Sequence, residues 1–438
     1  MVGRANMDNI YKSSDYRRSR KAYAAQCTFE YFITVLVADA FLANLLTYIG
    51  ISDALTGVIA SFISLAFLFQ LLSIFIVEKI NNPKKTVILC NCLSQFLFMC
   101  LYIVPFIPIS KEIKTLLVIA FIMLAYIFNY MVSGVLFKWA NSFVNPARRA
   151  EFSAIKEMIS LLSGIIFTLA VGHIIDRFTA IGEMEKGFVF IASAMLILNI
   201  CNFVSLMLIN KDSAAMQKER ASEENVSFRE VIANTLRNKN FVSVIIMTSM
   251  WYAARYMTVG FMGTFKTKDL LISVGMVQII NIAGNIARLI VTRPFGRFSD
   301  KTSYATGLKW AFIIEAAAFA INMFATPKTW WCVIVYTVLY NISLAGSNQN
   351  SFNITYSYVD SKYIVQAMAI KNSIGGVCGF LISLLASRIL HFIQGNGNVL
   401  FGIPLYGQQL LSLFSIIILI AAVLYIKFVI EKQKVKIQ

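Results

Sequence analysis

The chain has 438 residues, of which 58% are apolar and 14% charged, with a mean hydropathy of +0.70 and a formal net charge of +17 at pH 7. This balance excludes an ordinary water-soluble domain, in which about a quarter of the residues are charged. It predicts a membrane protein whose basic residues gather at one membrane surface, so a nucleic-acid partner is not needed to explain the charge.

Twelve apolar segments along the chain are long enough to cross a bilayer. A helical crossing needs about 20 apolar residues, because backbone amides and carbonyls in lipid must be satisfied within the segment. The predicted spans cover residues 29–50, 54–77, 86–109, 115–138, 156–175, 187–209, 241–263, 270–292, 307–325, 330–352, 367–390 and 407–430. The predicted fold class is therefore an all-α membrane protein.

The longest polar stretch separates the first six spans from the last six. We divide the chain into a basic N-terminus (1–28), a six-helix bundle (29–209), a linker (210–240), a second six-helix bundle (241–430) and a tail (431–438). Within the linker, Ser227 and Glu230 match a capping box and precede apolar residues at helical spacing. This pattern predicts a short helix at the inner membrane surface, with a solvated linker as the alternative for residues 211–226.

The two halves contain copies of one segment. Ala154-Ile155-Lys156 opens the fifth span, and Ala369-Ile370-Lys371 opens the eleventh, 215 residues later. The copies stay in step without a gap, so that Gly164 aligns with Gly379. Internal duplication of this kind is typical of solute carriers and predicts two pseudo-symmetric bundles.

The distribution of lysine and arginine predicts the orientation. With both termini in the cytoplasm, the inner segments hold 29 of the 39 basic residues, the outer loops hold 8, and Arg255 and Arg288 lie within spans. Positive loops are retained on the cytoplasmic side. The first apolar segment lacks a small-residue cleavage site, so we expect a retained helix and a multi-pass protein of the cytoplasmic (plasma) membrane.

Polar residues inside predicted spans are the candidates for a solute path, because ionisable groups at mid-bilayer are costly. The eighth span carries one polar stripe at steps of three, four and three residues, whereas the corresponding part of the second span is mostly apolar. Shorter polar faces lie on the fourth, seventh and tenth spans. The predicted substrate-binding residues are Asn129, Tyr130, Trp251, Arg255, Gln278, Asn281, Asn285, Arg288, Tyr340 and Ser347.

These polar faces have two interpretations. An aromatic and amide-rich lining suits a polar organic solute, because rings cover apolar faces while amides match hydroxyls and carbonyls. The alternative is helix packing, since Asn and Ser also join helices in lipid. For a single residue we favour packing, and for the stripe on the eighth span we favour the solute path.

Asp39 is the acid deepest in the first half, and Arg255 occupies the corresponding span of the second half. We hypothesise that they are partners and that Asp39 carries a coupling proton, which it releases when Arg255 approaches. The alternative is a permanent ion pair that holds the two halves together.

The sequence Gly296-Arg297-Phe298-Ser299-Asp300-Lys301, followed by Gly307-Leu308, resembles the signature loop of the major facilitator superfamily. The equivalent loop of the first half keeps Glu78 and Lys79 but has Ile74 where the first glycine belongs. The resemblance implies that these loops gate the inner side, which makes Glu78, Lys79, Gly296, Asp300 and Lys301 gating residues. It also implies that the ninth span lies at the periphery, so Glu315 in that span is assigned a structural role. Lys156 and Lys371, at matched positions of the repeat, are assigned to the gate or to phosphate anchoring.

The predicted function is a secondary active transporter that moves a small polar organic solute, either sugar-like or an organic anion, by alternating access. Proton-coupled uptake is the favoured mode, and a drug or metabolite exporter of the same superfamily is the alternative. A channel or receptor is disfavoured by the two-fold repeat. We expect no enzymatic activity, cofactor, metal or nucleic-acid partner. The expected partners are the solute, a proton or other coupling ion and the bilayer, and the expected state is a monomer.

Overall fold

The computed structural model describes residues 11, 13–79, 83–145, 149–211, 237–359, 364–400 and 402–433. Over these ranges the chain is helical almost throughout, and the strands are two antiparallel two-residue segments, β1 (Val399–Leu400) and β2 (Ile403–Pro404). The predicted all-α class is confirmed. The linker helix predicted at Ser227 and Glu230 lies outside the described residues.

Eight helical segments in the described ranges are long and apolar enough to cross a membrane, or nine if one bent pair is a single span. Three further predicted spans, 86–109, 241–263 and 330–352, also contain helices, of 18, 20 and 28 residues. These three helices are long enough to span a membrane but are less apolar than the eight. Their polar residues are the reason, and two of the three contribute to the candidate site described below.

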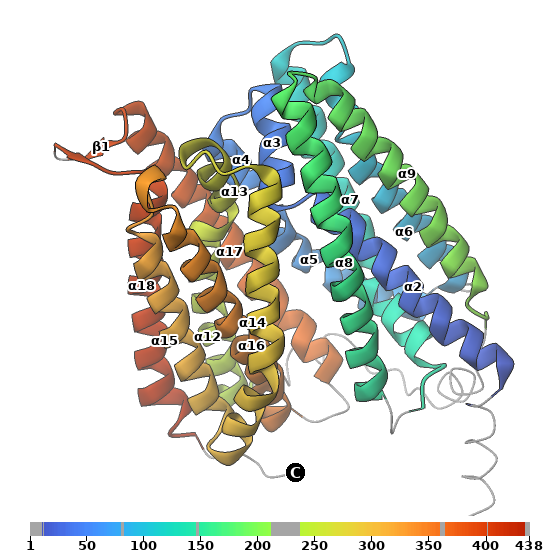
Figure 1. The fold of residues 1–438 in the computed structure, drawn as a ribbon. Coiled ribbons are helices and arrows are strands. Elements are labelled where there is room, and N and C mark those ends of the chain that lie inside the picture. The colour runs from blue at the N-terminus through green and yellow to red at the C-terminus, as the bar shows by residue number, and fades with distance from the viewer. Residues whose placement is uncertain are drawn as a thin grey trace, which may run out of the picture. The chain divides into compact units, whose positions relative to one another are not determined.

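The described helices belong to two compact units (Figure 1). The first unit comprises Met1–Ala38 and Leu72–Asn225, and the second comprises Asp39–Leu71 and Val226–Gln438. The first unit contains α2 (Ser14–Leu36), α6 (Pro83–Cys100), η1 (Val104–Phe106), α7 (Lys111–Asn141), α8 (Arg149–Ala180) and α9 (Met184–Leu208). The helix α5 (Phe62–Lys79) begins in the second unit and ends in the first.

The second unit contains the remaining helices of the described ranges. They are α3 (Asp39–Ile49), α4 (Asp53–Ala60), α12 (Lys239–Thr258), η3 (Val259–Phe261), α13 (Met262–Thr264), η4 (Phe265–Asp269), α14 (Val274–Lys301), α15 (Tyr304–Asn322), η5 (Pro327–Thr329), α16 (Trp331–Tyr358), α17 (Ile364–Gly395), α18 (Gly407–Tyr425) and η7 (Ile426–Ile430). The segment 39–71, which the sequence assigns to the first bundle, thus packs with the second unit.

The first predicted span, residues 29–50, is not one continuous helix. It breaks at Val37 and Ala38, between the end of α2 and the start of α3. Asp39 has a φ of 44°, in the left-handed region that Asp tolerates better than most residues because its short side chain bonds locally. The boundary between the two units coincides with this break.

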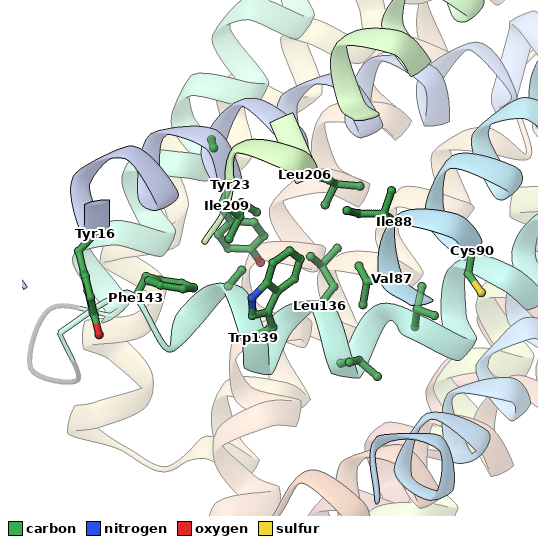
Figure 2. Close-up of a cluster of buried hydrophobic side chains, with 14 of the residues drawn as sticks. Tyr16, Tyr23, Val87, Ile88, Cys90, Leu136, Trp139, Phe143, Leu206 and Ile209 are labelled. Atoms are coloured by element: carbon green, nitrogen blue, oxygen red, sulfur yellow. The ribbon is translucent and has the colours of Figure 1, made fainter. Parts of the chain in front are cut away.

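A buried apolar cluster fixes one end of α2 in the first unit (Figure 2). Trp139 of α7 is fully buried among side chains of α2, α6 and α9, and its indole Nε1 donates to the carbonyl of Asn210 at 3.0 Å. The backbone amide of Asn210 in turn donates to Ser19 Oγ at 3.1 Å. The end of α9 is therefore tied to both α7 and α2.

Trp139→Ala is expected to lower the free energy of unfolding by about 3 kcal/mol, because it opens a cavity and removes the indole hydrogen bond. Phe137→Ala is the matched control, since Phe137 lies on the same helix and is 63% exposed. Thermal unfolding of both variants in one detergent measures the difference. Equal destabilisation would contradict the assigned role of this cluster.

The sequence repeat corresponds to a repeated contact in the structure. A Cβ added to Gly164 of α8 would meet the ring of Tyr31 on α2, and a Cβ added to Gly379 of α17 would meet the ring of Tyr256 on α12. Each glycine therefore allows a tyrosine of a neighbouring helix to approach closely. The aligned glycines perform the same packing task in the two units.

The helix α14 extends beyond the predicted span 270–292 and continues through Pro294 to Lys301. A proline within a helix removes one backbone hydrogen bond and usually bends or ends it. Of the residues that resemble the signature loop, 296–301 therefore lie in the last turns of α14, and Gly307 and Leu308 lie in the first turns of α15. Ser303 accepts a hydrogen bond from the amide of Thr306 and caps the following helix, α15.

Candidate functional site

Arg255 lies inside the second unit, on α12, surrounded by aromatic rings. Its guanidinium carbon is 6.0 Å from the ring centroid of Trp251, 5.8 Å from that of Tyr256 and 6.0 Å from that of Tyr340. At these distances the rings attract the cation through their quadrupoles. Tyr340 also stacks on Tyr336, with centroids 5.6 Å apart, so α16 supplies one aromatic wall of the site.

Glu315 of α15 completes this cluster. Its side chain is fully buried, and Trp251 Nε1 donates to Glu315 Oε2 at 2.9 Å. The carboxylate and the Arg255 guanidinium interact electrostatically. We call Trp251, Arg255, Glu315 and Tyr340 the aromatic-arginine cluster. It combines one cation, one acid and flat apolar faces, which are the features that bind small polar organic molecules.

Several polar atoms of this region have no hydrogen-bond partner among the described residues. They are Thr248 Oγ1, Arg255 Nε, Glu315 Oε1 and Ser347 Oγ. Burying such a group without a partner costs about 1 to 3 kcal/mol. The unsatisfied donors and acceptors therefore provide hydrogen-bonding capacity for a polar solute or for water within the second unit.

Asp39 is paired with Lys266 rather than with Arg255. Lys266 Nζ lies 2.7 Å from Asp39 Oδ2, and Asn281 Nδ2 donates to the same oxygen at 3.0 Å. Lys266 is buried despite its charge, so the carboxylate compensates an ammonium that water does not reach. The direct Asp39–Arg255 pair predicted from the repeat is wrong, because Lys266 of η4 lies nearer to the carboxylate.

Tyr336 of α16 interacts electrostatically with Asp39, Glu315 and Arg255. Tyr336 therefore lies near both the Asp39–Lys266 pair and the aromatic-arginine cluster. The two groups together contain four predicted site residues, namely Asp39, Trp251, Arg255 and Tyr340, and Asn281 of the eighth-span stripe.

A second group of polar side chains surrounds Asp53, at the start of α4. Asp53 is nearly fully buried and accepts from Lys268 Nζ at 3.0 and 3.2 Å and from Gln394 Nε2 at 2.9 Å. Asp269, next in the chain to Lys268, accepts from Gln408 Nε2 at 3.2 Å. Burial and the neighbouring Asp53 raise the pKa of Asp269 from 3.8 to about 6, against the opposing effect of Lys268.

Asp269→Asn is expected to stabilise the protein at pH 7.5 by roughly 1 kcal/mol, allowing for the part exposure of this carboxyl. The folded chain holds the Asp269 proton up to about pH 6, whereas the unfolded chain releases it near pH 3.8. The stability that this proton confers is therefore full below pH 3.8 and lost as the pH rises to 6. Thermal unfolding between pH 4 and 7.5 tests this, with exposed Asp300→Asn as the control. A gain of the same size at pH 4 would contradict it.

The other predicted residues of the eighth-span stripe lie on α14 with different degrees of burial. Gln278 is buried, and Asn285 and Arg288 are half-buried. Gly284, on the same helix, would bring a Cβ within 2.5 Å of Asn341 Nδ2, which shows that α14 and α16 approach closely there. The stripe is thus partly a packing surface, and a substrate contact by Gln278, Asn285 or Arg288 remains a proposal.

In the first unit, the predicted residue Asn129 contacts an acid. Asn129 Nδ2 donates to Glu30 Oε1 and Gln26 Nε2 donates to Glu30 Oε2, both at 2.6 Å. Tyr130 has its ring centroid 6.4 Å from that of Tyr126. The carboxylate of Glu30 is thereby satisfied by two amides that come from α2 and α7.

The predicted gating residues occupy several environments. Gly296 is buried, and a Cβ there would meet the side chain of Gln349, whereas Asp300 and Lys301 are exposed. The side chains of Glu78 and Lys79 lie outside the part of the chain that the structure describes. No gating role is tested by these positions.

The two lysines of the repeat differ in their surroundings. Lys156 is half-buried, with Nζ 4.6 Å from the ring centroid of Tyr23 and 3.4 Å from its hydroxyl. Lys371 is buried, and its Nζ donates to the carbonyl and hydroxyl of Ser351 at 3.0 Å and to Thr355 Oγ1 at 3.2 Å. The aligned positions therefore share a residue type but not a contact.

Two groups of this site did not emerge from sequence reasoning. From the sequence alone, Glu315 is assigned a structural role, although a single acid within an apolar span also indicates a functional site. Lys266 was counted among the outer-loop charges, and only the turn of η4 brings it to Asp39. No spacing rule relates Lys266 to a residue 227 positions earlier in the chain.

The comparisons with known proteins agree with this fold. A family model described as Major Facilitator Superfamily matches residues 25–383. No curated protein is significantly similar to the chain. A solved mutant structure of the nucleoside transporter NupG shares 14% identity at a TM-score of 0.71, covering 93% of this chain and 99% of that one.

An auto-inhibited peptide transporter of the POT family shares 9% identity at a TM-score of 0.69, covering 96% of this chain and 98% of that one. A POT family transporter in complex with 5-aminolevulinic acid shares 12% identity at a TM-score of 0.65, covering 93% and 96%. At these identities the likeness concerns the fold alone. The family match over most of the chain, together with the apolar helices, shows that this protein is a non-enzymatic membrane transporter of the major facilitator superfamily.

Proposed function

We propose that the protein carries a small polar organic solute across the cytoplasmic membrane by alternating access and works as a proton-coupled uptake system. The observation that supports this most is the aromatic-arginine cluster, with buried and unsatisfied polar atoms on Arg255 and Glu315. A guanidinium between aromatic rings favours a solute with a carboxylate, carbonyl or hydroxyl group beside an apolar part.

The fold neighbours support a substrate of this size. Their titles name a nucleoside transporter and peptide transporters, one of them in complex with 5-aminolevulinic acid. Within the same proposal, the chain forms twelve spans in two six-helix bundles, has both termini in the cytoplasm and functions as a monomer. Asn129, Tyr130, Gln278, Asn285, Arg288 and Ser347 are proposed as further solute contacts, and Glu78, Lys79, Lys156, Gly296, Asp300, Lys301 and Lys371 as gating residues.

The experiment that tests transport is counterflow in proteoliposomes. Purified protein is first screened by thermal shift against sugars, carboxylates, nucleosides, short peptides and cationic drugs, and the stabilising solute is then used with a radioactive label. A carrier exchanges labelled for unlabelled solute and saturates. An ionic conductance that does not saturate with solute concentration would overturn the proposal. Solute movement that a pH gradient drives only in the outward direction would identify an exporter.

Asp39 is the proposed site of the coupling proton. Its carboxylate binds both Lys266 and Asn281. A proton on Asp39 therefore weakens both contacts and releases the side chains of Lys266 and Asn281. Asp39→Asn is expected to abolish accumulation driven by a pH gradient but to leave counterflow within roughly threefold of the original rate, because counterflow needs no net proton movement.

Asp53→Asn is the control for this measurement. The carboxylate of Asp53 also forms an ion pair with a lysine, but its partner is Lys268 and not Lys266. It is expected to leave gradient-driven accumulation in place. If Asp39→Asn protein still accumulates solute against its gradient in response to pH, the proton role of Asp39 is wrong. Normal counterflow by the same preparation shows that the protein is folded.

A further inference from the structure

A basic groove lies at the N-terminal end of α2, apart from the site described above. It has a volume of about 620 Å³, and its lining includes Arg17, Arg18 and Lys21 of α2. Ala22, Ala25 and Leu208 contribute an apolar floor from α2 and α9. No aspartate or glutamate is among its described lining residues. Three cations therefore converge on one concave surface without an acid in its wall.

The shape of the groove is fixed by the core behind it. The opposite face of α2 presents Tyr16 and Tyr23 to the buried cluster around Trp139 (Figure 2). Arg20 is held separately, because it donates to the carbonyls of Tyr11 at 2.9 Å and Phe143 at 3.0 Å. The groove cations thus lie on a helix that is anchored on its other side.

The positive potential of the groove is reinforced at the end of α9. Lys84 Nζ donates to the carbonyls of Met207 at 2.8 Å and Ile209 at 2.6 Å. Burial and the charge of Arg18 lower the pKa of Lys84. The influence of Arg18 places Lys84 near the wall of the groove, so an anion bound there is attracted by Lys84 as well as by the three cations of α2.

The groove continues into an apolar surface. Along α9, the exposed side chains leading from Leu208 include Met207, Val204 and Ile200, with exposed fractions of 52%, 48% and 55%. In a protein of this class such a strip contacts lipid acyl chains. A ligand that fills the groove and the strip therefore has an anionic head and an apolar tail.

We propose that the basic groove binds the phosphate-bearing headgroup of an anionic phospholipid, with its acyl chain along α9. Basic clusters at the cytoplasmic ends of membrane helices attract anionic lipids by about 1 kcal/mol for each Lys or Arg. Occupancy joins the start of α2 to the end of α9 through a lipid. The inference concerns the first unit alone and stands whether or not the proposed solute is correct.

Lipid binding by the full-length purified protein tests the proposal. Phosphatidylglycerol is titrated into protein in detergent and bound lipid is counted by native mass spectrometry, with phosphatidylcholine as the uncharged-headgroup comparison. The double variant Arg18→Gln with Lys21→Gln is expected to bind phosphatidylglycerol roughly tenfold or more weakly, from the loss of two charges. Phosphatidylcholine binding is expected to stay unchanged.

The matched control is Lys427→Gln with Lys432→Gln, which removes two exposed cations near the end of α18. It is expected to change phosphatidylglycerol binding by less than about twofold. An equal loss in both double variants would identify a nonspecific charge effect and overturn the proposal. Displacement of the lipid by millimolar inorganic phosphate would identify a soluble-anion site and overturn it as well. Equal melting temperatures of the proteins in phosphatidylcholine exclude misfolding as the cause of lost binding.

Discussion

Replacing Arg255 by alanine is expected to reduce saturable solute transport by a factor of 100 or more. The substitution removes the cation from between the rings of Trp251, Tyr256 and Tyr340. It also leaves the fully buried Glu315 carboxylate without its positive neighbour. Loss of one good charged hydrogen bond to a solute costs roughly 1.5 to 3 kcal/mol, and the stranded acid adds to that cost.

Counterflow and thermal shift on the same preparations measure this effect. The solute that stabilises the original protein is expected to leave the melting temperature of Arg255→Ala unchanged. It is expected to raise that of the control variant Lys328→Ala, which replaces a basic residue of η5, by the full amount. The double variant Arg255→Ala with Glu315→Gln removes both charges and tests whether folding, rather than binding, is the cause of the loss. Equal loss of the ligand shift in Arg255→Ala and Lys328→Ala would refute the assigned site.

Asp39→Ala is expected to lower the free energy of unfolding by roughly 3 kcal/mol. The substitution leaves Lys266, which is 4% exposed, as a buried ammonium without a carboxylate, and breaking a buried ion pair in this way is strongly destabilising. Asn281 loses its acceptor in the same step. Denaturant or thermal unfolding in detergent measures the change.

A double-mutant cycle separates the ion pair from other effects of Asp39. Lys266→Met removes the charge and keeps an apolar side chain of similar length, so Asp39→Ala combined with Lys266→Met is expected to recover more than half of the lost stability. The pair Asp53 and Lys268 offers a comparison, because Lys268 is about half exposed and its stranded charge reaches water. If Asp39→Ala and the double variant unfold alike, Lys266 does not depend on Asp39.

The repeat of Ala-Ile-Lys in the two halves was a reliable guide to backbone packing but not to side-chain chemistry. Gly164 and Gly379 each leave room for the ring of a tyrosine on a neighbouring helix, because a glycine has no Cβ to occupy that space. Lys156 and Lys371 differ, because their contacts come from residues on other helices that the repeat does not conserve. Duplication preserves the scaffold, and each copy then acquires its own partners.

The family, the helical class and the approximate position of the apolar helices were determined by the sequence alone. The bilayer imposes these features. A segment in the lipid interior must form its backbone hydrogen bonds within itself and must be apolar over about 20 residues. Such long apolar segments can be recognised directly in the amino-acid sequence. The polar residues Asp39, Trp251, Arg255 and Tyr340 were also recognisable as unusual within such segments.

Only the tertiary structure decided which of these polar groups meet. The left-handed turn at Asp39 and the short η4 segment bring its carboxylate to Lys266. The helix α15 packs mainly on α16 and α18, and the indole side chain of Trp251 on α12 reaches across to Glu315. Such contacts depend on bends and helix rotations that arise from the sum of many weak packing terms. A charge pair joined across 227 residues leaves no local pattern in the chain, so its partner is chosen when the helices pack.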